Sequence, residues 1–222
     1  MILKQNILLC LFTFVAFSAS AQDGTAQQLL WSDVHITKEI NESFSAKVKL
    51  SYFNTVLTFS PRFIDVGFNY QPTNKLQFGL YYRFRGNFET SCRRVYFETT
   101  YKKIEIKPLG IEISPRFRVQ HRLFSEAKTE DFHYFQMRPR IMVKKTLSAF
   151  PNTTLFTVIE TFHTTTPEQT VAFSRFRFDL GVHYDVPNSK HQIKVACRHQ
   201  VNMEAGQKEM LGMLSVGYSF RF

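Results

Sequence analysis

The sequence lacks any apolar run long enough to cross a membrane as a helix. The longest run, from Ile7 to Phe17, has 11 residues, whereas a spanning helix needs about 20. A helical membrane protein is therefore excluded. The same run follows Lys4 and precedes Ala19-Ser20-Ala21, which is the pattern of a cleaved export signal.

We expect cleavage after Ala21, so that residues 1–21 form a signal peptide. The remaining residues, 22–222, contain no Pro/Gly/Ser-rich linker and no low-complexity block. Their length is typical of one domain. We therefore predict one exported domain.

Cysteine is scarce, with 3 residues in 222. Cys10 lies in the expected signal, which leaves Cys92 and Cys197. A disulfide needs a geometry that spacing alone does not supply, and we interpret these two residues as unpaired thiols. The histidines have no short ligand spacing, and no glycine-rich phosphate-binding loop is present. We predict no metal, no cofactor and no soluble-enzyme chemistry.

Acidic residues are also few, with 18 Asp and Glu against 28 Lys and Arg. The net charge of +10 could suggest nucleic acid. However, the basic residues occur singly in alternating segments, and an exported protein rarely meets nucleic acid. We expect instead lipopolysaccharide phosphates, small anionic solutes or internal ion-pair partners, and no nucleic acid.

What the sequence does contain is alternation of apolar and polar residues. The chain ends with a strand in which Leu214, Val216, Tyr218, Phe220 and Phe222 share one face, as a period of two requires. Behind an export signal, this pattern indicates the last strand of a transmembrane β-barrel. We expect Tyr218, Phe220 and Phe222 to be the membrane-insertion signal that the barrel-assembly machinery recognises.

Alternating segments continue along the whole mature chain. Eleven can be counted, whereas single-chain bacterial barrels are expected to have an even number of strands. We therefore predict an all-β, antiparallel transmembrane barrel of 10 or 12 strands with a polar, arginine-rich lumen. The segments are 29–38, 43–53, 62–71, 75–86, 93–104, 109–123, 132–146, 153–164, 172–185, 190–202 and 210–222.

The connections between these segments fall into two classes that alternate along the chain. Compact turns suit the periplasmic side and longer polar stretches suit the outside. The compact turns lie at 72–75, 107–110, around Pro151-Asn152, and at 187–190, and the longer stretches at 86–92, 124–131, 164–171 and 203–209.

Almost all charged residues share one parity within the segments. Facing lipid, each cation would cost about 2–4 kcal/mol at the bilayer midplane, so we place the charged face inward. The lumen-lining candidates are Asp65, Arg83, Arg85, Arg94, Glu98, Glu112, Arg116, Arg118, Arg138, Arg140, Glu160, Arg175, Arg177, Asp179 and Arg198.

Such a lumen allows two functions. In the first, the acids each bridge several guanidiniums, which gives a structural or surface barrel with a salt-bridged interior. Alternatively, the surplus of arginine favours a passive pore with a weak preference for small anions. The first requires only features that the sequence contains, and we place it ahead of the second.

Several short segments, read in order, resemble the exported proteins catalogued as domain of unknown function 2490. The resemblance covers almost all of the mature chain, and its weight comes from the order and spacing of the motifs. It implies an outer-membrane barrel of unassigned role in a Gram-negative bacterium, with no catalytic residues to transfer. The segments are Trp31, Gly79–Phe84, Arg93–Phe97, Arg116–Arg118, Arg138–Arg140, Glu160–Phe162, Ser174–Arg177 and Gly181–Tyr184.

A third function is lipid modification at the membrane surface. Outer-membrane lipid hydrolases need a serine, a histidine and an orienting polar group, and the nearest grouping here is Ser174, His163 and Glu160. His163 does not alternate cleanly with Glu160. We therefore expect no enzyme activity, and we expect the barrel's partners to be outer-membrane lipid, lipopolysaccharide and the assembly machinery.

Overall fold

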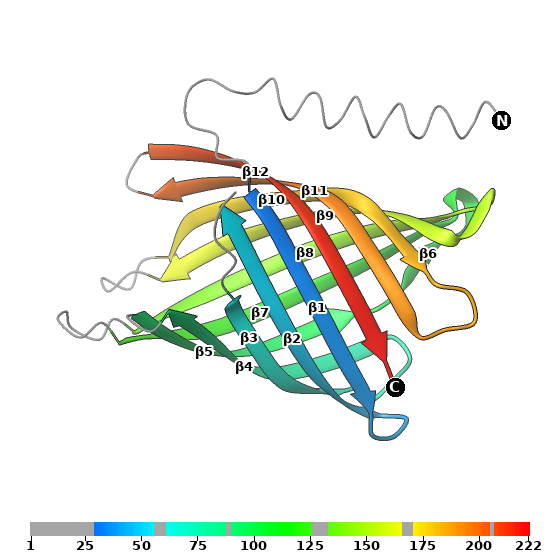
Figure 1. The fold of residues 1–222 in the computed structure, drawn as a ribbon, viewed down its shortest axis with the longest axis horizontal. Coiled ribbons are helices and arrows are strands. Elements are labelled where there is room, and N and C mark those ends of the chain that lie inside the picture. The colour runs from blue at the N-terminus through cyan, green and yellow to red at the C-terminus, as the bar shows by residue number, and fades with distance from the viewer. Residues whose placement is uncertain (1–28, 56–60, 88–89, 126–132, 166–170, 205–206) are drawn as a thin grey trace.

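The fold is a closed β-barrel with tilted strands (Figure 1). The computed structural model describes residues 29–55, 61–87, 90–125, 133–165, 171–204 and 207–222. The expected signal peptide, 1–21, lies outside these residues. Among the residues described, no helix is long and apolar enough to cross a membrane.

The alternating segments form the strands, and their bounds differ from those predicted by only a few residues. The exceptions are a three-residue strand and a single 3-10 turn between the fifth and sixth predicted segments. The elements are β1 Leu29–Glu39, β2 Phe44–Thr55, β3 Pro61–Tyr70, β4 Leu76–Asn87, β5 Thr90–Tyr101, β6 Ile104–Ile106, η1 Lys107–Leu109, β7 Ile111–Ser125, β8 His133–Leu147, β9 Phe150–Thr165, β10 Val171–Asp185, β11 His191–Glu204 and β12 Gln207–Arg221.

The barrel prediction is confirmed, but the predicted strand number is wrong. In the described residues eleven strands form the closed wall, and β6 pairs only with β7. Neighbouring strands are antiparallel except at the closure, where β1 pairs with β12 in parallel, from Leu29 opposite Met213 to Thr37 opposite Arg221. Figure 1 shows these two strands, blue and red, side by side with their arrows in the same direction. A parallel closure removes the requirement for an even number.

The compact turns lie together at the end of the barrel that holds Phe222. The Asn41 side chain accepts hydrogen bonds from the backbone N–H groups of Ser43 and Phe44. Gly110 and Asn188 adopt positive φ values of 60° and 55°, which glycine and asparagine tolerate best. One turn is displaced from its prediction, because Pro151 already belongs to β9 and the chain reverses at 148–149.

Polar side chains are buried and apolar ones are exposed, which is the reverse of a soluble domain. On β3, Asp65 is 1% exposed, whereas its neighbours Val66 and Phe68 are 48% and 58% exposed. The same inversion occurs on β4, where Arg83 is buried and Leu80 is exposed. The strand period therefore sends the charged residues to the interior and gives the wall an apolar outer surface.

Two glycines leave room for a tyrosine that lies flat on the inner wall. A Cβ on Gly67 would come within 2.3 Å of the Tyr81 ring, and one on Gly79 within 2.5 Å. Tyr81 stacks on Tyr96, with ring centroids 4.9 Å apart, and its hydroxyl donates to Asn69. These glycines thus serve close packing inside the barrel.

The parallel closure can be tested by cross-linking. Ser32 on β1 lies opposite Val216 on β12, and neighbouring strands are about 4.8 Å apart, within the range that a disulfide spans. In a chain whose native cysteines are replaced by serine, Ser32→Cys with Val216→Cys should form an intrachain disulfide in the folded barrel. Its formation is measured by non-reducing gel mobility and intact mass.

The matched control is Ser32→Cys with Phe220→Cys, which moves the second cysteine four residues along the same strand, about 13 Å. That pair should stay reduced. Equal oxidation of both pairs, or none of the first, would contradict the parallel register.

Candidate functional site

The barrel encloses a cavity of about 1130 Å³. Its lining extends from Gln192 and Ser219, near the end that holds the C-terminus, to Met203 and Leu211, near the opposite end. The cavity therefore follows the length of the lumen. It is the candidate site because the charged side chains of the wall converge on it.

The charges that line this cavity do not balance. Within the described residues, sixteen Lys and Arg side chains line it against five carboxylates, a surplus of eleven positive charges. Eleven of the sixteen are arginines, which stay protonated in proteins. The carboxylates are Asp33, Asp65, Glu98, Glu160 and Asp179.

The structure places thirteen of the fifteen predicted lumen residues on the cavity wall. The side chain of Arg85 lies outside the described residues.

Glu112 has the inward parity but lies at the rim, where Lys103 Nζ donates to it at 3.1 Å and also contacts Glu105. Hydrogen bonds to Glu105 and Glu112 raise the pKa of the exposed Lys103. Glu112 was assigned to the lumen from parity alone, which does not say where a strand leaves the barrel.

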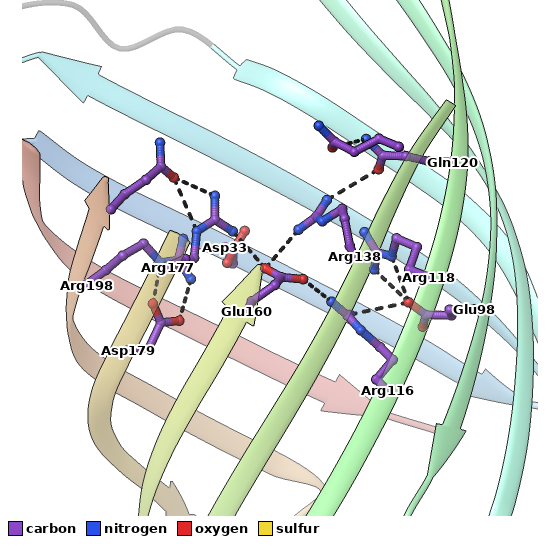
Figure 2. A network of polar contacts seen from close by, with 12 residues as sticks. Asp33, Glu98, Arg116, Arg118, Gln120, Arg138, Glu160, Arg177, Asp179 and Arg198 are labelled. Atoms are coloured by element: carbon purple, nitrogen blue, oxygen red, sulfur yellow. Dashed lines mark hydrogen bonds and ion pairs between the residues drawn. The ribbon is translucent and has the colours of Figure 1, made fainter. Parts of the chain in front are cut away.

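Glu160 on β9 is the centre of the largest polar network (Figure 2). Its carboxylate is 3% exposed and accepts hydrogen bonds from Arg116 at 2.6 Å, Arg138 at 3.0 Å and Arg177 at 3.3 Å. These arginines come from β7, β8 and β10. One carboxylate therefore holds guanidiniums from three other strands.

The network extends on both sides of Glu160 (Figure 2). Arg116 also donates to Glu98 on β5, at 3.3 Å, and Arg118 donates to the same Glu98 oxygen at 2.7 Å. On the other side, Arg177 donates to Gln200 on β11 at 2.8 Å. Six neighbouring strands, β5 and β7 to β11, are thus joined through side chains.

The other carboxylates hold cations on adjacent strands. Arg83 binds Asp65 with two nitrogens, and Arg198 binds Asp179 with two, at 2.7 and 2.8 Å. Within each pair, the two residues lie directly opposite each other on adjacent antiparallel strands. Opposite charges in such positions stabilise a sheet.

Asp33 completes the set and was not among the predicted residues. It accepts hydrogen bonds from Lys49 Nζ at 3.0 Å and from Ser51 Oγ at 2.6 Å. The alternation of residues 29–38 is weak, so their faces could not be assigned from sequence. The pairing of β1 with β2 opposes Asp33 to Ser51 and sets its orientation.

Aromatic rings also contact several of these arginines. Phe162 is 2% exposed, and the guanidiniums of Arg138, Arg175 and Arg177 lie 4.3, 5.2 and 5.0 Å from its ring centre. Arg118 lies 4.0 Å from the centre of the Tyr96 ring. A cation above a ring face is attracted by the ring's quadrupole, so these rings supplement the few carboxylates.

These inner rings were not predicted, because only charged residues were considered as lumen-lining candidates. Phe162 has the same parity as Glu160, and Phe156 and Val158 share it. That shared parity is the signal that could have identified them.

Arginines also face one another directly across the sheet. Arg116 lies opposite Arg140, and Arg118 opposite Arg138, between β7 and β8. Arg94 on β5 lies opposite Arg83 on β4 and opposite Arg122 on β7. Like charges in directly opposed positions destabilise a sheet. Departures of this kind from local preference are expected at functional sites.

The grouping considered for lipid hydrolysis does not assemble. Glu160 is engaged by arginines inside the lumen, and His163 is hydrogen-bonded to Thr161 at 3.1 Å. Ser174 Oγ contacts Thr164 Oγ1 at 2.9 Å and the Phe162 carbonyl at 3.2 Å. In the described residues no hydrogen bond joins His163 to Ser174 or Glu160, and no cluster of metal ligands is found there.

The three aromatic residues predicted as an insertion signal lie at the end of β12. Tyr218 and Phe222 are 40% and 46% exposed. His191 bonds the Tyr218 hydroxyl at 2.5 Å and stacks on Phe220. Hydrogen bonds between Phe222 and the backbone of Thr37 and Glu39 join the chain end to β1.

Cys197, on the same sheet, is a free thiol, and the side chain of Cys92 lies outside the described residues.

Comparison with known proteins finds one matching family. Residues 28–210 match the family described as "Protein of unknown function (DUF2490)". A search of curated proteins finds no match. Among solved structures, the fold is similar to a "Bacterial polysaccharide outer membrane secretin", with a TM-score of 0.56 and 9% identity, over 78% of this chain and 62% of that one. The chain thus spans less than two thirds of this neighbour, and such low identity shows a shared fold alone.

The role of Glu160 generates a stability prediction. Glu160→Gln removes the charge that three buried guanidiniums share, and breaking a buried ion pair from one side costs about 3–5 kcal/mol. The free energy of unfolding in urea, measured on the barrel in detergent, should fall by about 3 kcal/mol.

The control is Glu39→Gln, since Glu39 pairs with Arg221 at 3.6 Å where both side chains are more than half exposed. An exposed pair contributes about 0–1 kcal/mol. If both variants lost the same small amount, the Glu160 network would not be stabilising the barrel.

Proposed function

The chain belongs to the DUF2490 family, whose function is unknown, and from that premise we propose that it is an outer-membrane barrel whose lumen conducts small anions. The observation that carries the proposal is the surplus of eleven positive charges along the described lining of the cavity. A wall with this surplus attracts anions and repels cations at close range. Rings of arginine and lysine are the usual lining of anion pores.

The dimensions of the cavity support passage of small solutes only. At about 3.4 Å per residue and a tilt near 40°, Gln192 and Met203 on β11 lie roughly 28 Å apart along the barrel axis. A volume of about 1130 Å³ over that length gives a mean cross-section of roughly 40 Å².

The outer surface supports a position in a membrane. Exposed apolar side chains occur on almost every strand, among them Val66, Leu80, Phe117, Ile141 and Leu214. A continuous apolar surface of this kind is unfavourable in water and suits lipid. We propose insertion into the outer membrane of a Gram-negative bacterium after export by the signal at 1–21, with lipid, lipopolysaccharide and the assembly machinery as partners.

A structural barrel is the second candidate, and the network through Glu160 favours it. That network joins six strands and would stiffen the wall whether or not anything passes. However, five carboxylates cannot neutralise sixteen cations, so ion pairing alone leaves the lumen with a net positive charge. We propose no catalytic role for Ser174, because Thr164 and a backbone carbonyl are its hydrogen-bond partners.

The proposal predicts ion currents. Purified protein in a planar bilayer, under a potassium chloride gradient, should show discrete conductance steps and a reversal potential of the sign expected for chloride selectivity. Arg175→Glu changes the charge of a residue that lines the cavity and should shift the reversal potential toward zero.

The matched control is Lys145→Glu, which makes the same change of charge at an exposed position of β8. It should leave the reversal potential where it is in the unmodified protein. A silent bilayer, for protein whose folding is shown by heat-modifiable gel mobility, would reject the pore and leave the structural barrel.

A further inference from the structure

We infer that the lumen contains a binding site for an oxyanion of the phosphate class, between Lys47 on one wall and Arg140 with Arg116 on the opposite wall. The inference rests on the proposed function in one respect, that anions enter the lumen. It goes further by assigning one ligand class to one place. Three observations carry it.

The first observation is convergence across the barrel. Lys47 is on β2 and Arg140 on β8, and four wall strands separate them on one side and five on the other. Nevertheless, Lys47, Arg118 and Arg140 all line the same cavity. The Lys47 ammonium interacts electrostatically with Glu98 and, more weakly, with Arg118 and Arg140. Cations from opposite walls therefore approach one another at this level of the lumen.

The second observation is the distribution of carboxylates around this cluster. Glu98 and Glu160 lie nearby, but their oxygens accept hydrogen bonds from Arg116, Arg118, Arg138 and Arg177. In the described part of the chain no carboxylate lies within ion-pair distance of Lys47 or Arg140. The Nε of Arg140 is buried, and no hydrogen-bond acceptor contacts it among these residues.

The third observation is the opposition of Arg116 and Arg140 across the β7–β8 ladder. Two guanidiniums held side by side repel each other. Glu98 and Glu160 offset part of that cost at Arg116, and an oxyanion between the two arginines would offset the remainder at Arg140. The Glu160 carboxylate shows the same geometry, since it gathers three guanidiniums from three strands. The wall can therefore position several donors around one group of oxygens.

The side-chain types at this place select an oxyanion over a halide. The planar guanidinium matches two oxygens of phosphate or carboxylate at once, and lysine contributes a point charge. Inorganic phosphate offers several oxygens and up to two charges at neutral pH. It should therefore bind here more tightly than chloride.

The test is calorimetric titration of the purified, lipid-free barrel in detergent with inorganic phosphate at constant chloride. The unmodified protein should bind phosphate saturably. Lys47→Gln and Arg140→Gln should each weaken binding about tenfold, the equivalent of one charge-assisted contact of about 1.4 kcal/mol. Arg140→Lys retains the charge without the planar fork, and should fall between the unmodified protein and Arg140→Gln.

Lys145→Gln is the matched control, because it removes one positive charge next to Lys144 on the exposed face of β8. It should leave phosphate affinity unchanged. Weakening equal to that of Lys47→Gln would mean general attraction to a basic protein, and would overturn the site. Each variant is first shown to be folded by heat-modifiable gel mobility.

Two outcomes separate this inference from the proposed function. Anion-selective currents without saturable phosphate binding would overturn the site and leave the pore. Saturable binding that depends on Lys47 and Arg140, in a protein that forms no channel, would support the site and overturn the pore.

Discussion

The side chains of a strand point alternately to its two faces. In a closed barrel, one face of every wall strand lines the same lumen. In this chain the inward face carries sixteen Lys and Arg side chains and five carboxylates along the described lining. The electrostatic surplus that results is the constraint on which the rest of the interior depends. Several features of the lumen neutralise part of that charge or separate one cation from the next.

Three devices serve this purpose. Carboxylates are placed where they reach several cations at once, as Glu160 does between β7, β8 and β10. Aromatic rings such as Phe162 and Tyr96 lie beneath guanidiniums. Glycines at Gly67 and Gly79 allow Tyr81 to lie against the wall and support Tyr96 by stacking. These devices leave part of the positive charge of the lumen unbalanced. We propose that anions balance this remainder.

Most of the wall could be predicted from the sequence, because a period of two identifies both a strand and its faces. The strand number could not. Parity assumes that the first and last strands are antiparallel, whereas β1 and β12 meet in parallel through residues nearly two hundred positions apart. Nothing local in Leu29–Glu39 encodes that contact.

The interior shows the same division between local and non-local information. Parity correctly placed thirteen residues on the cavity wall. It could not show that Glu112 lies at the rim, or that Asp33, on a weakly patterned strand, faces the lumen. It also could not show which cations share a carboxylate. That depends on the stagger between strands, which sets Arg140 opposite Arg116 and Glu160 opposite Arg177.

The central claim is that anions balance the lumen's surplus charge. The most direct measurement is an anomalous difference map from crystals of the barrel soaked in bromide. The account predicts bromide peaks inside the lumen, beside the guanidiniums of Arg140 and Arg116 and the ammonium of Lys47. Bromide bound only at rim cations such as Lys103, with none in the lumen, would contradict it.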